Sequence, residues 1–384
     1  MRWIWNALCS FWLTCLVLIG LMWLTVIGTL TQQPDMLGLH RSQLVYFNSF
    51  VVTTTLGSVQ IPVFPGGQTL MLLLFVNLVC GGLVRLRKGW RTAGIMITHC
   101  GMLLLLASGF VKYWMADEGF LLLHEGDKAN WYESQHEWEI AVREKVAGSQ
   151  VTEHRIDEAR FRGAHAGAPA VFTAAQLPFA VEVHEVLENC QPAQKGPMAP
   201  ARSRVFDGYF LKDLGPHHEH ERQAMGLVLA LAERGGAQRN ESVLWGLSDV
   251  PWVVQSAGRR FEIELRRKRY DLPFTLRLDD ARHETHARST MAKSYESTVT
   301  KVFDAREQRV EIRMNEPLRH GDYIVFQSTM GGGGDEGGQY SGFSIVRNPS
   351  DQWPMWACFV IGFGLFVHFV AKLFKYVRAT WETA

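Results

Sequence analysis

The stretch GIMITHCGMLLLLASGF, residues 94–110, has no Asp, Glu, Lys or Arg and reads as the middle of a membrane-spanning helix. His99 interrupts it. An imidazole in hydrocarbon is costly unless its nitrogens are bonded, so His99 needs a partner there. The stretch therefore predicts a membrane protein and raises the question of what His99 binds.

Four long runs of the chain contain no Asp, Glu, Lys or Arg: 3–34, 42–84, 92–111 and 352–371. A helix needs about 20 apolar residues to cross the hydrocarbon core. Pro62 and Pro65 interrupt the run 42–84, so its first half is expected to be an outer or interfacial loop. We therefore expect four transmembrane helices, at about 7–30, about 68–84, about 92–112 and 352–372.

The first run could instead be a cleaved signal peptide. One basic residue precedes it, its hydrophobic core is too long, and it has no small-x-small cleavage site. These features favour a retained helix.

The basic residues predict the orientation of the chain. The loop RLRKGWR (85–91) and the segment after the last helix are basic, and the bias of Lys and Arg to the cytoplasmic side places both inside. Both termini, including the tail 373–384, are then cytoplasmic. The segment 114–351 is extracytoplasmic.

The outer segment 114–351 is long enough for a domain with its own core. Apolar and polar residues alternate along four parts of it, as in half-buried strands: 261–278, 294–303, 309–314 and 322–329. We expect a mostly-β, sandwich-like domain between the third and fourth helices.

Several classes of function have no support in the sequence. No acidic or basic residue lies deep in a span, so the chain has no residues for transport along intramembrane charges. There is no CxxC or CxxCH, no nucleotide-binding loop, no nucleophile elbow and no basic surface for nucleic acid. We find no catalytic residues.

The third helix has two different faces. On a helical wheel Gly94, Thr98, Gly101, Leu105 and Ser108 share a mostly small face that suits packing against the chain's own helices. His99 is about 140° away and is expected to point outward. It can bond a neighbouring backbone or Asn77, or it can be an axial ligand of a haem iron.

His368 is the second intramembrane histidine. It lies four residues before Lys372, close enough to the boundary to snorkel towards it, with a haem-ligand role as the alternative.

Several motifs resemble, in order, the ResB family, also called CcsB. They are NLVCGGLVRL (77–86), ITHCGMLLLLASG (97–109), LPFTLRLDD (272–280), SYESTV (294–299) and NEPLRHGDYIVFQSTM (315–330), followed by the final span. No motif in 114–260 matches.

This resemblance implies a role in system II cytochrome c biogenesis in a bacterial cytoplasmic (inner) membrane. ResB-type proteins act with a ResC/CcsA-type partner to export haem and present it to apocytochrome c. The matching histidine of the family helps to ligate haem within the membrane. The resemblance therefore implies that His99 gives one axial ligand to a haem b iron and that the partner gives the other. No haem lyase activity is expected from this chain alone.

Two other hypotheses stay open from the sequence. The chain could be a self-contained b-type cytochrome in which His99 and His368 bind one haem. It could also be a haem-free scaffold whose helices anchor the β domain.

Overall fold

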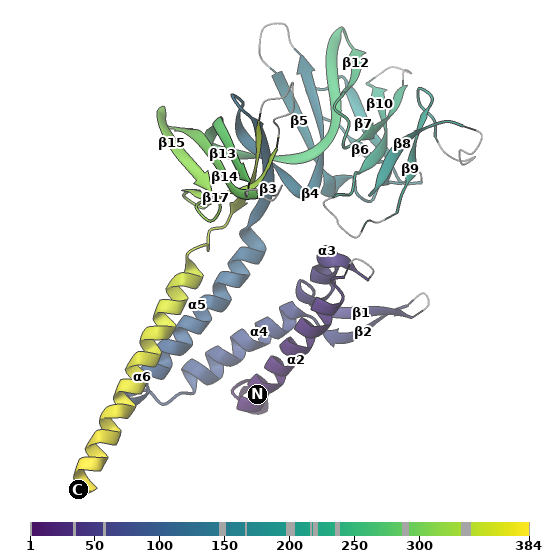
Figure 1. The fold of residues 1–384 in the computed structure, drawn as a ribbon. Helices are drawn as coiled ribbons and strands as arrows, with labels where there is room; N and C mark the ends of the chain where they lie inside the picture. The colour runs from purple at the N-terminus through teal and green to yellow at the C-terminus, as the bar shows by residue number, and fades with distance from the viewer. Residues whose placement is uncertain are drawn as a thin grey trace. The chain divides into compact units, whose positions relative to one another are not determined.

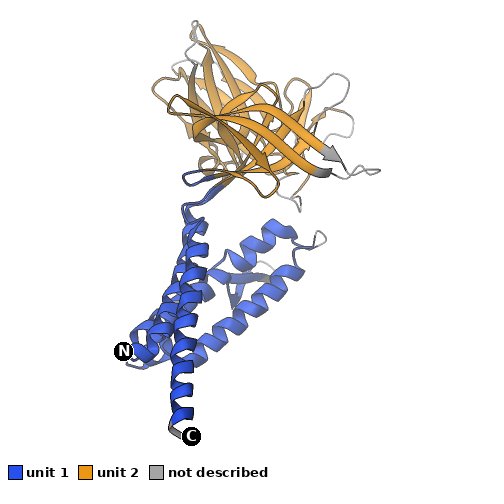
Figure 2. Ribbon diagram, turned by 60° about the vertical axis from the view of Figure 1, so that its left-hand side comes forward, with its two compact units in different colours: residues 1–117, 320–323, 347–384 blue, residues 118–319, 324–346 orange. Residues whose placement is uncertain are grey.

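The structure is a computed structural model that describes residues 2–33, 36–56, 59–145, 151–165, 167–196, 204–215, 217, 222–234, 239–285, 292–331 and 339–383. The chain divides into two compact units (Figure 2). The helical unit comprises 1–117, 320–323 and 347–384, and the β unit comprises 118–319 and 324–346.

Among its described residues, the helical unit contains four helices that are long and apolar enough to cross a membrane: Phe11–Leu30, Gly67–Val84, Trp90–Met115 and Trp353–Trp381. Figure 1 shows them with the shorter elements around them. The α-helices are α1 (Arg2–Leu8), α2 (Phe11–Leu30), α3 (Gly38–Ser42), α4 (Gly67–Asn77), α5 (Ala93–Met115) and α6 (Trp353–Thr383). Two π-helices, η1 (Gln43–Phe47) and η2 (Leu78–Val84), and one 3-10 helix, η3 (Trp90–Thr92), complete the set.

The region expected to be a loop between the first two spans is partly regular. Strands β1 (Val51–Leu56) and β2 (Val59–Pro65) form an antiparallel hairpin. Pro62 is tolerated because the hairpin has only two strands and its register shifts beside Val52. At the open end of this hairpin, Val52 and Phe64 pack with apolar side chains of α2 and α4.

Two helix ends also differ from expectation. The first span begins at Phe11, where Ser10 accepts a hydrogen bond from the backbone N–H of Trp12, and a separate helix α1 precedes it. At the other end, α6 continues to Thr383, so the segment expected as a tail is helical. At about 1.5 Å per residue, its 31 residues extend about 46 Å, well beyond a hydrocarbon core of about 30 Å.

The β unit confirms the mostly-β domain expected between the third and fourth helices. Its larger sheet has the order β15-β14-β13-β4-β3-β18-β17-β16, with β12 and β5 paired to β13 and β4. A four-stranded sheet has the order β11-β10-β7-β6, and β8 pairs with β9. The strands of the larger sheet are β3 (Asp117–His124), β4 (Lys128–Lys145), β5 (Val151–Asp157), β12 (Trp252–Ser256), β13 (Arg259–Thr285), β14 (Ala292–Phe303), β15 (Arg306–Arg313), β16 (Leu318–His320), β17 (Tyr323–Gly331) and β18 (Tyr340–Arg347). The others are β6 (Ala170–Phe172), β7 (Phe179–Leu187), β8 (Cys190–Gln194), β9 (Tyr209–Asp213), β10 (Gly226–Glu233) and β11 (Arg239–Trp245).

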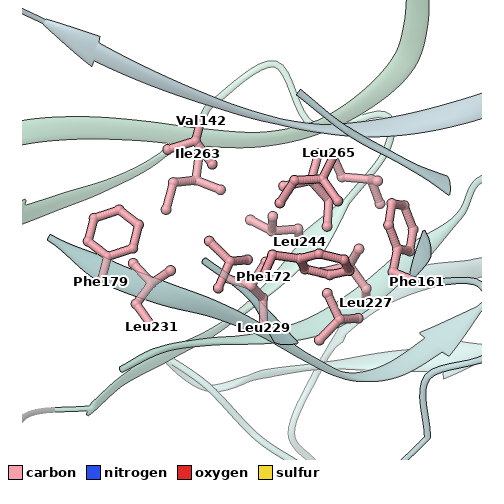
Figure 3. Close-up of a cluster of buried hydrophobic side chains, with 14 of the residues drawn as sticks. Val142, Phe161, Phe172, Phe179, Leu227, Leu229, Leu231, Leu244, Ile263 and Leu265 are labelled. Carbon is pink, nitrogen blue, oxygen red and sulfur yellow. The ribbon is translucent and has the colours of Figure 1, made fainter. Parts of the chain in front are cut away.

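A filled apolar core joins the four-stranded sheet to part of the larger sheet (Figure 3). Phe179 on β7 and Phe261 on β13 meet edge to face, with ring centroids 4.9 Å apart. Phe261 and Leu229 are fully buried. This two-sheet packing is the sandwich that the alternating sequence predicted.

Ion pairs link β4, β5 and β13 beside this core. Nη2 of Arg266 lies 2.8 Å from carboxylate oxygens of both Glu139 and Glu153. Burial raises the pKa of the Glu139 carboxyl. Burial also acts to raise the pKa of Glu153, but hydrogen bonds from Arg266 and Arg155 outweigh it and lower that pKa to about 2.

Candidate ligand cavity in the membrane helices

His99 lies on α5 against the π-helical segment η2 of the second span. A Cβ atom added at Gly82 would be 3.0 Å from Cδ2 and 3.2 Å from Cγ of the imidazole. A larger residue at this position would therefore press on the ring. Because π-helical turns are rare and often mark functional sites, this contact identifies the region as a candidate site.

A cavity of about 500 Å³ is lined by residues of α2, α4, η2 and α5, together with Cys9 and Ser10 ahead of α2. His99 lines it. Most of the other lining residues are apolar, and the polar ones lie towards the start of α2: Ser10, Thr14 and Asn77. The volume is in the range of cofactor and small-molecule sites.

The imidazole of His99 is poorly satisfied. Its Nδ1 atom is buried without a hydrogen bond of normal geometry, and the nearby polar group is the carbonyl of Ile95, one turn earlier. Ligating histidines often direct one ring nitrogen to a backbone carbonyl and bind the metal through the other. The ring therefore suits an axial haem ligand that uses Nε2.

Asn77 is not the partner of His99, which corrects one of the expected alternatives. Its amide nitrogen donates to the carbonyls of Leu8 at 2.7 Å and Ser10 at 3.1 Å, and its oxygen accepts from the hydroxyl of Thr14 at 2.6 Å. The break between α1 and α2 creates this arrangement, because carbonyls at a helix end need donors from elsewhere.

A second hydrogen bond to the segment between α1 and α2 comes from the residue that follows η2. Nη1 of Arg85 donates to the carbonyl of Cys9 over 3.4 Å. Gly81 lies beside the same carbonyl, where an added Cβ would be 3.4 Å from the oxygen, an ordinary van der Waals contact. Sequence reasoning placed Gly81 and Gly82 in a family-like motif and used Arg85 for the orientation of the chain, but it did not place any of the three beside His99 or the start of α2. The available signal was a glycine pair inside an apolar span, followed by an arginine.

The small face of α5 packs against α6, as expected. A Cβ at Gly94 would be 2.5 Å from the backbone nitrogen of His368, and one at Gly101 would be 2.7 Å from the side chain of Ile361. Leu105 departs from this face and lines the cavity instead. The outward direction expected for His99 was also wrong, because the chain's own first two spans stand beside it.

His368 occupies different surroundings from His99. Its Nδ1 atom is buried without a hydrogen-bond partner, its ring centroid is 5.6 Å from that of Phe369, and it does not line the cavity. The buried Nδ1 does not support the expected snorkelling. Among the described residues there is no group of three or more His, Cys, Asp or Glu that could hold a metal ion.

These features define a multi-pass helical membrane protein with a large, mostly-β domain between its third and fourth spanning helices. The model of the ResB-like family matches residues 242–337, which begin within β11 and include β12 to β17, and this agrees with the resemblance to the ResB/CcsB family. The match supports a general role in cytochrome c biogenesis. No curated protein matches the chain.

Proposed function

We propose that the chain is a ResB-like subunit of the system II cytochrome c maturation complex. It acts with a ResC/CcsA-type membrane partner to export haem and present it to apocytochrome c. Both termini are cytoplasmic in this proposal, and the β unit faces the periplasm or the outside of a bacterial inner membrane. Haem is the substrate that passes through the complex.

The observation that carries the proposal is the imidazole of His99 in the wall of an apolar cavity, with an Nδ1 atom that makes no hydrogen bond of normal geometry. A neutral imidazole in dry surroundings suits axial ligation of haem iron. His99 holds the iron from one side, and leucines on α2, α4 and α5 exclude water. Among the described residues, no second histidine lines the cavity. In this proposal the partner therefore supplies the other axial ligand.

The self-contained b-type cytochrome has less support. It requires His99 and His368 to bind one haem. The backbone at His368 lies against Gly94, whereas the His99 ring lies against Gly82, and only His99 lines the cavity. Shared ligation within this chain would therefore need a different helix arrangement.

The test is the haem content of the protein purified with its ResC/CcsA-type partner, measured by the pyridine haemochrome spectrum. Wild type is compared with His99→Ala and with His368→Ala, the other intramembrane histidine, as the matched control. We expect His99→Ala to lose most of the haem while the complex stays intact, and His368→Ala to keep it.

The other outcomes separate the alternatives. Equal haem in wild type and His99→Ala would contradict the proposal and leave the chain a scaffold. Haem retained by the purified chain alone, and lost on either substitution, would establish the b-type cytochrome instead.

A further inference from the structure

We infer that Arg85 binds a carboxylate of the ligand that His99 holds, and so sets the direction in which that ligand lies in the cavity. The inference rests on the proposed function. It adds an anion-binding residue to a site that otherwise has one imidazole and mostly apolar walls.

Arg85 and His99 are joined through the same short stretch of the second span. Gly82 touches the imidazole, and Arg85 follows three residues later, where its guanidinium reaches the carbonyl of Cys9. Cys9 itself lines the cavity. Arg85 is exposed and does not itself line the cavity, but its guanidinium reaches a residue that does.

Two of the polar groups at this end of the cavity, Asn77 and Thr14, are already committed, while the Ser10 hydroxyl accepts from the backbone N–H of Trp12. Both N–H groups of the Asn77 amide donate to backbone carbonyls, and the Thr14 hydroxyl donates to the Asn77 oxygen. They have no donor left for an anion. The guanidinium of Arg85 has five N–H donors, and among the described residues it makes one long hydrogen bond and no ion pair.

The cavity is polarised along the helices. Cys9, Ser10 and Asn77 lie at the end near Arg85, whereas Leu18, Leu74 and Leu106 line the part farther from it. A ligand with an apolar body and carboxylates on one edge matches this gradient. Haem has this shape, and an arginine–carboxylate pair is a strong charge-assisted interaction.

The test titrates the complex of the full chain and its partner, freed of haem, with haem and with haem dimethyl ester, whose carboxylates are blocked. Wild type is compared with Arg85→Ala, Arg85→Lys and Arg87→Ala. Arg87 belongs to the same basic segment, but among the described residues its side chain makes no hydrogen bond or ion pair and it does not line the cavity, so it controls for general charge. Binding is followed by the Soret absorbance.

We expect Arg85→Ala to weaken haem binding on the order of tenfold or more, Arg85→Lys to weaken it less, and Arg87→Ala to leave it unchanged. The ester should bind wild type and Arg85→Ala equally. Equal ester binding also shows that the variant is folded.

Arg85→Ala that binds haem as tightly as wild type would overturn the inference. So would an equal weakening of ester binding, since Arg85 would then act on the fold. If haem binding depends on His99 but not on Arg85, only this inference fails. If wild type binds no haem, the proposed function fails and the inference fails with it.

Discussion

The two apolar interiors of this protein are built differently. The core of the β unit is closely packed around Phe261 and Leu229, which are fully buried between two sheets, and a partly polar pocket of about 420 Å³ borders it at Leu244, Ile263 and Leu265. The interior between α2, α4 and α5 holds a cavity of about 500 Å³ with an unsatisfied imidazole in its wall. A filled interior serves stability, whereas an unfilled one beside a ligating side chain points to an occupant from outside.

The largest effect expected on stability comes from the filled core. Phe261→Ala should lower the free energy of unfolding of the β unit by about 3–5 kcal/mol, because a cavity replaces a fully buried ring. Urea unfolding of the full chain in detergent, followed by the circular dichroism of the strands, measures this. The control is Phe303→Ala, because Phe303 is 44% exposed. A cost below 1 kcal/mol at Phe261 would contradict a filled core.

The ion pairs beside the core make a somewhat smaller contribution to the free energy of unfolding, and this contribution depends on pH. The folded pKa of Glu153 is about 2, below its ordinary value of 4.5, so its ionised form stabilises the fold. This contribution is present above about pH 4.5 and is lost as the pH falls towards 2. Glu153→Gln should cost at most about 3 kcal/mol at pH 7.

Thermal unfolding of wild type and Glu153→Gln between pH 7 and pH 2 measures the effect. The difference between their midpoints should shrink below pH 4.5. Glu311→Gln, in an exposed pair with Arg313, is the control. A difference that stays constant over this pH range would rule out the ionised carboxylate as its cause.

The packed side of α5 should tolerate no added volume. Gly94→Val places a side chain where a Cβ already lies 2.5 Å from the α6 backbone, so we expect a loss of about 1–3 kcal/mol from overpacking. Gly109→Val is the matched control on the same helix, because a Cβ there meets nothing within 4 Å. Denaturation in detergent, followed by the helical circular dichroism signal, compares the two. Equal losses would show that the α5–α6 contact is not the cause.

The smallest effect is expected at the wall of the cavity. Leu106→Ala removes atoms that border empty space and should cost less than about 1 kcal/mol, whereas Leu229→Ala in the filled core should cost about 2–5 kcal/mol. The helical and strand signals of the same full-length protein report on the two variants. Similar costs would remove the difference between the interiors.

Much of the fold was predictable because the bilayer imposes simple rules. Charge-free runs predicted the four spans, and alternation predicted the strands now seen as β13, β14, β15 and β17. The strands between 117 and 256 were not predicted individually. Part of the reason is that β10, with the sequence GLVLALAE, is buried on both faces and does not alternate.

The site was predictable only in part. His99 stood out because an imidazole is costly in hydrocarbon. The residues around His99 could not be predicted in the same way. A helical wheel gives the direction in which a side chain leaves its own helix, but it does not show which other helix lies in that direction. The roles of Asn77 and Arg85 depend on the break at Cys9 and Ser10, which lies inside a run without charges and has no proline or glycine to mark it.

The π-helical segment Leu78–Val84 determines on which side of the second span its last residues lie. A π turn holds one residue more than an α turn, and each residue of an α-helix turns the chain by about 100°. If the same residues formed a regular α-helix instead, Arg85 would be rotated by about 100° relative to the residues before the segment and would face away from Cys9. The backbone form of this span is therefore as much a part of the site as any side chain that lines it.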